Sequence, residues 1–195
     1  MELGIDILAM LFAAAFIAAF IDAIAGGGGL ITIPALLMTG MPPAMALGTN
    51  KLQAFGGALS ASIYFLRKRA VNLSEFSFIL LVIFVGSVIG TLLIQSLDAS
   101  LIKKGLPFLI LAIGLYFLFT PKLGENDRKQ RISYGVFALC FGSLLGFYDG
   151  FFGPGTGSLM NLACVTLLGF NLTKATAHAK VMNLTSNFAS LIFFL

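Results

Sequence analysis

The stretch IDAIAGGGGLITIPALL, residues 21–37, decides how this chain folds. Asp22 lies near the end of a long apolar run, and four glycines, Gly26 to Gly29, follow almost at once. A glycine costs about 1 kcal/mol relative to alanine in a helix interior, so four in a row predict a break. The flanks are apolar enough for a bilayer, where unwound backbone is tolerated only inside protein or beside a cavity. The stretch therefore predicts a broken helix enclosed by protein at membrane depth.

The composition points to a membrane protein. Of the 195 residues, 58% are hydrophobic and 10% are charged, whereas about 25% of residues are charged in a soluble domain. We therefore expect an all-helical, polytopic integral membrane protein that has the lipid bilayer as its partner. The net charge of +4 lies mostly in short loops, so it bears on topology and does not predict nucleic-acid binding. No cysteine or histidine spacing predicts a metal site, and we expect no cofactor.

Eight apolar runs follow one another along the chain. Two of them, 29–40 and 158–170, are too short for an ordinary span of about 20 residues, and their length suits half of a broken helix or a re-entrant segment. A short loop with Asp98, Lys103 and Lys104 is expected between the fourth and fifth runs. The six longer runs are 7–25, 44–66, 76–97, 105–120, 132–150 and 174–195.

The second half of the chain repeats the first. Asp22 corresponds to Asp149 and Lys51 to Lys180, with two residues inserted at the second glycine break. Charged residues are rare in membrane spans, so the matching aspartates and lysines are the main evidence for the repeat. The polar loop 121–131 divides a first repeat, 1–124, from a second, 125–195. The first repeat has two further spans after 44–66 and the second does not, which predicts a full protein of about 250 residues.

The orientation of the repeats follows from the basic loops. Loops 67–69 and 122–131 are separated by two spans, so both lie on one side, and the positive-inside rule makes that side cytoplasmic. If 29–40 crosses the bilayer, each repeat has five segments and the two repeats are inverted, as in many secondary transporters. If 29–40 is re-entrant, the repeats are parallel. We expect the inverted arrangement.

Lys51 and Lys180 are the first candidate site residues. A lysine at the centre of a membrane helix costs about 2.5–3.5 kcal/mol on insertion scales. Each could lie near a helix end and reach the membrane surface. Alternatively, the two form a cationic site for an anion, or act as counter-ions for Asp22 and Asp149.

The glycine breaks are the second candidate. Helices that restart after Gly29 and Gly157 would direct free N–H groups and a positive dipole end at the break, which suits an oxyanion such as a sulfonate. A tight hairpin between packed helices is the alternative. The predicted substrate-binding residues are Lys51, Lys180, Gly27, Gly28, Gly29, Gly155, Gly157, Asn50 and Thr49.

The carboxylates complete the site. Asp22 and Asp149 can bind and release a proton, the usual coupling device in transporters, or they can cap a helix or pair with lysine. His178, the only histidine, joins them as a pH-responsive group or a simple hydrogen-bonding one. An intramembrane enzyme would need a nucleophile and a base, such as Ser158 and His178. The repeat preserves neither of these, so no catalytic residue is expected and transport is favoured over an enzyme or a passive channel.

Four motifs carry a resemblance to a known family. They are GGGGLITIPALL (26–37), ALGTNKLQAFGG (46–57), GFYDGFFGPGTGS (146–158) and ATAHAKVMN (175–183). In these motifs the chain resembles the TauE/SafE family of sulfite-exporter-like transporters, above all its YfcA-like members. The resemblance implies a multi-pass transporter of small sulfur-containing organic or inorganic anions in the bacterial cytoplasmic membrane. Association with further copies of the chain stays open.

Overall fold

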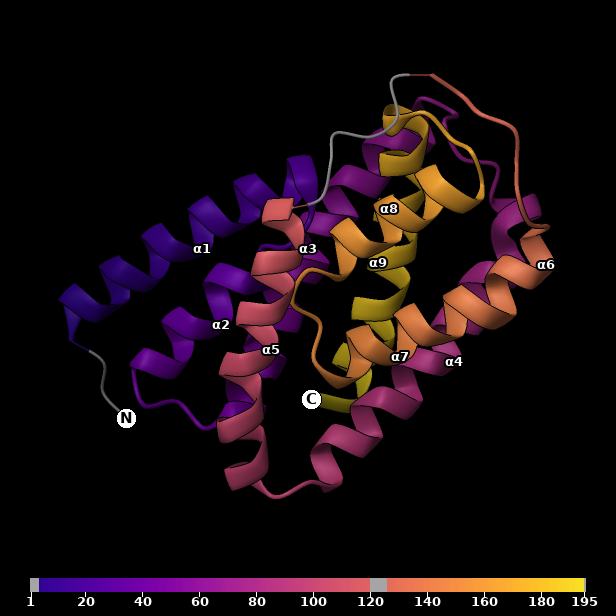
Figure 1. Cartoon of the computed structure of the whole chain (residues 1–195). Coiled ribbons are helices and arrows are strands. Elements are labelled where there is room, and N and C mark those ends of the chain that lie inside the picture. The colour runs from indigo at the N-terminus through magenta and orange to yellow at the C-terminus, as the bar shows by residue number, and fades with distance from the viewer. Residues whose placement is uncertain (1–3, 120–125, 195) are drawn as a thin grey trace.

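The computed structural model describes residues 4–119 and 126–194, and within them every regular element is a helix (Figure 1). The predicted all-helical class is confirmed. The predicted repeat boundary at 124/125 and the predicted run ends at Thr120 and Leu195 lie outside the described residues. The helices are α1 (Ile5–Ala25), α2 (Gly29–Met38), α3 (Pro43–Arg67), α4 (Leu73–Ser96), α5 (Ala99–Phe119), α6 (Tyr134–Val136), α7 (Ser143–Phe151), α8 (Thr156–Leu167) and α9 (Leu172–Phe194), with a π-helical segment Phe137–Gly142 joining α6 to α7.

The two short helices α2 and α8 correspond to the two short apolar runs. They have 10 and 12 residues, about 15–18 Å of helix, which is too little to cross a bilayer core of about 30 Å. Glycines with positive φ border them: Gly27 (φ 102°) and Gly40 (φ 81°) around α2, and Gly155 (φ 77°) directly before α8. Such φ values are readily adopted only by glycine. Pro43 begins α3, the position where a proline stabilises a helix start.

The expected loop with Lys103 and Lys104 is corrected by the structure. Helix α5 begins at Ala99, so both lysines lie inside its first two turns. The reason is local: the Asp98 carbonyl accepts hydrogen bonds from the N–H groups of Leu101 and Ile102, and aspartate is a favoured residue at a helix start. Both lysines are exposed, so the helix includes them without burying a charge.

Three helices in the described part of the chain are long and apolar enough to cross a membrane: Ile5–Ala23, Leu73–Ser96 and the continuous helix Tyr134–Phe151. Large apolar side chains on these and neighbouring helices are exposed, for example Phe12 (76%) and Phe108 (76%). An apolar exterior of this kind suits contact with lipid, not with water. Helices α3 and α9 have 25 and 23 residues but carry the buried polar residues described below.

Helices α4 and α7 run side by side (Figure 1) and approach through glycines. Gly86 and Gly90 of α4 face Gly146 and Gly150 of α7, each pair four residues apart. A Cβ atom on Gly86 would lie 2.7 Å from the Ser143 carbonyl oxygen, and one on Gly150 would overlap the Ser87 carbonyl oxygen. Small residues at this spacing let membrane helices pack backbone to backbone. This contact fixes α7, and with it Asp149, against the rest of the molecule.

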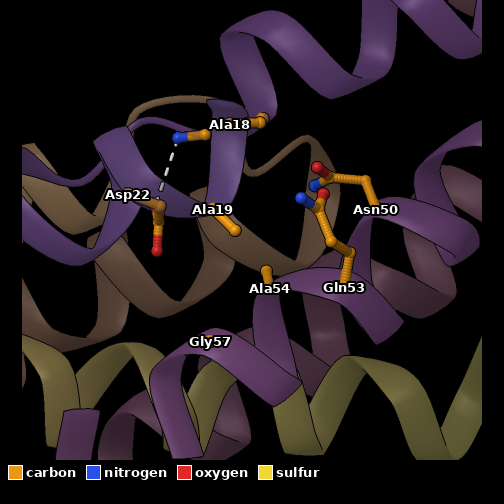
Figure 2. A pocket seen from close by; sticks show the side chains of 9 residues that line it. Ala18, Ala19, Asp22, Asn50, Gln53, Ala54 and Gly57 are labelled. Carbon is orange, nitrogen blue, oxygen red and sulfur yellow. Dashed lines mark hydrogen bonds between the residues drawn. The ribbon is translucent and has the colours of Figure 1, made fainter. Parts of the chain in front are cut away.

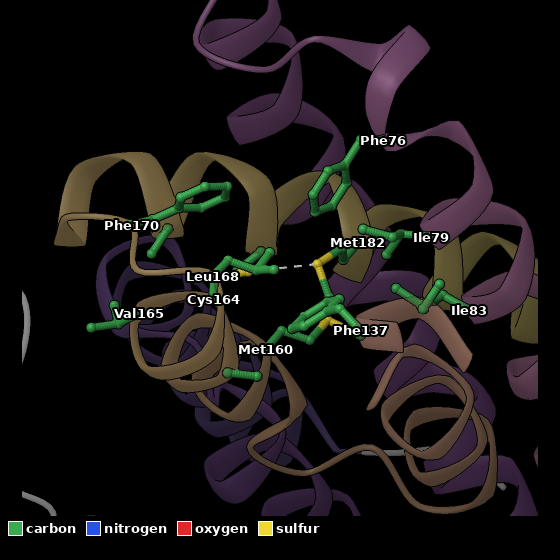
Figure 3. Close-up of a cluster of buried hydrophobic side chains, with 14 residues drawn as sticks. Phe76, Ile79, Ile83, Phe137, Met160, Cys164, Val165, Leu168, Phe170 and Met182 are labelled. Atoms are coloured by element: carbon green, nitrogen blue, oxygen red, sulfur yellow. Dashed lines mark hydrogen bonds between the residues drawn. The ribbon is translucent and has the colours of Figure 1, made fainter. Parts of the chain in front are cut away.

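A buried apolar cluster holds α4, α8 and α9 together (Figure 3). Figure 3 shows Phe76 and Ile79 of α4 close to Met182 of α9, with Phe137 below Met182 and Cys164 to its left. Helix α3 packs along α9, and the rings of Phe55 and Phe188 lie 5.9 Å apart between them. The helices that carry Lys51 and Lys180 are therefore neighbours, although 129 positions separate the two lysines in the sequence.

Candidate functional site

The two glycine breaks meet in space. The Ser158 hydroxyl at the start of α8 donates to the Gly26 carbonyl over 3.0 Å. A Cβ on Gly26 would lie 2.6 Å from the Gly157 carbonyl carbon, and one on Gly29 would lie 3.4 Å from the Pro154 Cα. Only glycine permits so close an approach of two backbones. The N-terminal ends of α2 and α8 are therefore brought together inside the protein.

Lys51 reaches this junction from α3. Its side chain is 1% exposed, and its ammonium group donates to the Asp149 carbonyl oxygen and lies 3.0 Å from Asp149 Oδ2. The Asp149 side chain is itself 2% exposed. Removing two charges from water is costly, and a close ion pair with further hydrogen bonds compensates that cost.

Lys180 makes the corresponding pair from α9. Its ammonium group donates to the Asp22 carbonyl oxygen and lies 3.3 Å from Asp22 Oδ2. The Lys180 side chain is 4% exposed and the Asp22 side chain is 16% exposed. Of the interpretations offered above for the lysines, the geometry fits counter-ions of the two aspartates, because both lysine side chains are buried and neither ammonium reaches the surface.

The pairing crosses between the two halves of the chain. The lysine of the first half pairs with the aspartate of the second, and the lysine of the second half pairs with the aspartate of the first. In both pairs the ammonium contacts the same two groups, a carboxylate oxygen and the backbone carbonyl of the same aspartate. The two halves are thus connected at this junction by two matching ion pairs.

The first glycine break is capped by Asp22. Its Oδ1 accepts hydrogen bonds from the N–H groups of Gly27 (3.0 Å) and Gly28 (3.1 Å). Free N–H groups at a helix start are the natural partners of an anion. In this structure the anion they hold is the Asp22 carboxylate, so these two donors do not face an empty site.

Two small cavities adjoin Asp22, and the larger of them also adjoins Asp149. One has a volume of ≈ 20 Å³ and lies where the breaks meet, against Asp22, Asp149 and three asparagines; Gly27, Gly29, Gly155 and Gly157 also line it. The other, of ≈ 10 Å³, lies between α1 and α3. Figure 2 shows Asn50 and Gln53 of α3 directed toward Asp22 of α1 across this second cavity. Asp22 lines both cavities, whereas Asp149 lines only the first.

Three asparagines contribute to the larger cavity. Asn50, predicted from the sequence, is 4% exposed, and its Oδ1 has no hydrogen-bond partner among the described residues. Asn183 and Asn187 of α9 were not predicted. Their spacing in the sequence could have revealed them: they follow Lys180 by three and seven residues, which places Lys180, Asn183 and Asn187 on one helix face. A buried, unpaired amide oxygen beside a polar cavity is suited to a water molecule or a ligand.

Two other residues missed by the sequence reasoning support the site. The Tyr148 hydroxyl donates to the Pro154 carbonyl over 2.6 Å, which fixes the second glycine break. Gln53 accepts from the Thr32 hydroxyl (2.7 Å) and donates to the Ala15 carbonyl (2.8 Å). Gln53 thereby connects α1, α2 and α3 around the first break. No charge marked these residues, so the sequence alone did not separate them from ordinary polar residues.

The structure does not bring Thr49 and His178 to the site. Thr49 is exposed, and its hydroxyl lies 3.9 Å from the Met41 sulfur. The His178 ring lies between Phe76 (4.7 Å) and Phe170 (4.6 Å) and contacts the Lys174 carbonyl. Each residue precedes a site lysine by two positions, about 200° around the helix, so it points to the opposite side. Neither residue contacts an ion pair.

Comparison with known proteins decides the family. The sequence pattern of the family described as Sulfite exporter TauE/SafE matches residues 11–195. The chain belongs to the TauE/SafE family. No solved structure matches it.

Three TauE/SafE-type relatives are named as transporters. The chain is 76% identical over 195 residues to a "Probable membrane transporter protein" of Haemophilus influenzae, covering all of this chain and 76% of that protein. It is 57% identical over 190 residues to "Probable membrane transporter protein YfcA" of Escherichia coli K12 (97% of this chain, 70% of that protein). It is 50% identical over 194 residues to "Probable membrane transporter protein ORF9" of a Sinorhizobium species (100% and 74%). These names describe transport and not catalysis.

Proposed function

We propose that this TauE/SafE protein is a secondary transporter that moves small sulfur-containing anions, such as sulfite or an organic sulfonate, across the bacterial inner membrane. The observation that carries the proposal is the pair of crossed Lys–Asp contacts at the junction of two glycine breaks. Two lysines, two helix N-terminal ends and a polar cavity converge there. Buried ionisable residues in membrane helices characteristically mark the pathway of a substrate or ion.

The crossed pairs support an arrangement of two related repeats. A two-fold rotation that exchanges the halves would carry the Lys51–Asp149 pair onto the Lys180–Asp22 pair. Secondary transporters with inverted repeats hold substrate at the repeat interface, near the bilayer midplane, between broken helices. We propose the inverted arrangement, with the anion site between Lys51 and Lys180.

The size of the cavities supports alternating access over an open channel. A cavity must have about 10–15 Å³ to hold one water molecule, so volumes of ≈ 20 and ≈ 10 Å³ admit water and not a sulfonate. Under this proposal the small cavities correspond to a closed state, which a substrate enters only when the halves move apart. A passive channel would instead need a continuous pore through the same region.

The enzyme alternative has no support in the geometry. The Ser158 hydroxyl donates to the Gly26 carbonyl, and the His178 ring lies between two phenylalanines. Both arrangements are those of a packed framework. A nucleophile and its base would instead be expected to lie in direct hydrogen-bond contact.

Uptake by the full-length protein in proteoliposomes tests the proposed function. We expect accumulation of at least one of sulfite, sulfoacetate and sulfate, or of the zwitterionic sulfonate taurine, above the level in protein-free liposomes, because the site offers the Lys180 ammonium and backbone donors to an oxyanion. Glutamate, an anion without sulfur, serves as the comparison substrate. Uptake of none of the four sulfur compounds, with glutamate transported instead, would contradict the proposed substrate class.

A further inference from the structure

The Asp22 carboxylate occupies the place that an anionic substrate would take. Its Oδ1 accepts from the Gly27 and Gly28 N–H groups, and its Oδ2 lies 3.3 Å from the Lys180 ammonium. These three donors are what a sulfonate or sulfite oxyanion would use at this point. A residue of the protein thus competes with the substrate for the same partners.

The residues that line the two cavities also favour Asp22 over an external anion in this structure. Both are lined by Asp22, Gly29 and Asn50, and neither is lined by Lys51 or Lys180. The cavity walls therefore present carboxylate and amide groups, while the ammonium groups are turned to their aspartates. Two like charges at contact distance repel each other more strongly inside a protein than in water, so an anion is disfavoured here while Asp22 is ionised.

Building on the proposed function, we propose that an anion binds by replacing the Asp22 carboxylate, with one proton taken up on Asp22 for each monovalent anion. The proton adds to Oδ2, the contact between Oδ2 and the Lys180 ammonium breaks, and the ammonium turns to the incoming anion. The Asp22–Lys180 pair changes from neutral to a charge of +1, and the anion returns it to neutral. Transport through this site is then an electroneutral symport of a proton and an anion.

Asp22 is better placed than Asp149 to take up this proton. The Asp22 side chain is 16% exposed and lines both cavities, whereas the Asp149 side chain is 2% exposed and lines one. Asp22 also makes the contacts to backbone N–H groups that an anion would inherit. Asp149 therefore keeps its contact with Lys51 and holds the junction together.

Few other charges face Asp22. Three helices in the described part of the chain pack against α1, and two of them, α2 and α8, carry no acidic or basic residue. Helix α3 brings Lys51, which is turned to Asp149, and its other basic residue, Arg67, ends the helix. Helix α9 brings Lys180, and Asp149 of α7 lies across the larger cavity. The proton on Asp22 is thus governed by Lys180 and by the arriving anion.

Titration calorimetry with methanesulfonate tests the inference on the full-length protein in detergent. This probe is a small sulfonate whose single charge does not change over the working pH range. Repeating the titration in buffers of different ionisation enthalpy measures the protons taken up on binding. We expect about one proton per anion for the wild-type protein. Asp22→Asn, which imitates the protonated carboxyl, should bind at least tenfold more tightly at neutral pH and take up none.

Two further variants complete the test. Asp6→Asn makes the same chemical change at the exposed start of α1 and should behave as the wild-type protein. Adding Lys180→Gln to Asp22→Asn should abolish the binding gained, since the ammonium is then missing. The wild-type measurement stands even if Asp22→Asn does not fold.

Three results would overturn the inference: no proton uptake by the wild-type protein, unchanged proton uptake in Asp22→Asn, or no methanesulfonate binding by either protein. If the wild-type protein still accumulates a sulfur anion in proteoliposomes, the proposed function survives such a result and only the exchange with Asp22 fails. If accumulation is absent as well, the proposed function fails with it.

Discussion

Replacing Lys180 with alanine is expected to lower the initial rate of anion uptake about 100-fold at low anion concentration. The estimate corresponds to about 3 kcal/mol, the upper range for a hydrogen bond to a charged group. The fold should persist, because the Asp22 carboxylate is 16% exposed and keeps its contacts with Gly27 and Gly28. Proteoliposome uptake, with the elution profile of the purified variant as a check of folding, measures both effects.

A matched control for this variant lies on the same helix. Lys174→Ala removes an exposed lysine six positions before Lys180, whose ammonium lies 4.4 Å from the centre of the Phe170 ring and not at an ion pair, and uptake should stay near the wild-type rate. Lys180→Arg should retain part of the uptake, because the guanidinium keeps the charge but is larger and planar. A wild-type rate and affinity in Lys180→Ala would remove this lysine from the anion site.

The second large effect concerns stability. Lys51→Met should lower the free energy of unfolding by about 3–5 kcal/mol, since it leaves the buried Asp149 carboxylate without its partner. The double variant Lys51→Met/Asp149→Asn should recover most of that loss, because no unpaired charge remains. Neither Lys51→Met nor the double variant should transport. Thermal unfolding in detergent is compared across the wild-type protein, Lys51→Met, Asp149→Asn and the double variant, and the four values give the coupling energy between the two residues.

A different pattern would show that this pair is not what holds the junction together. If the double variant is as unstable as the sum of the two single variants, then Lys51 and Asp149 contribute independently. If Lys51→Met is as stable as the wild-type protein, then the buried carboxylate is accommodated without its lysine. Either result would leave the packing of Gly86, Gly90, Gly146 and Gly150 as the main connection between α7 and the rest of the molecule.

Local composition was enough to predict much of the fold. Neither the four glycines at 26–29 nor the sequence GPGTG at 153–157 favours a continuous helix, and so the short helices α2 and α8 were predictable from residues 26–40 and 153–170. The charged residues Asp22, Lys51, Asp149 and Lys180 were recognisable because charge is rare in membrane helices. What the sequence left open was which lysine pairs with which aspartate, since that depends on how distant helices pack.

Where the structure differs from the expected arrangement, the reasons are physical. Thr49 and His178 precede Lys51 and Lys180 by two positions, and two positions along a helix point to opposite sides. The loop at Lys103 and Lys104 was expected because charges usually lie outside spans, yet an exposed helix end accommodates them. The glycine contact between α4 and α7 was overlooked, although the spacing of four residues was visible.

The most direct test of the central claim is the position of a bound anion. Crystals of the full-length protein soaked in selenite, a heavier analogue of sulfite, would give an anomalous scattering peak wherever the anion binds. We expect a peak at the junction of the two glycine breaks, within hydrogen-bond distance of the Lys180 ammonium and the Gly27 and Gly28 N–H groups. A selenite peak elsewhere in the protein, with the Lys180–Asp22 pair still closed, would contradict it.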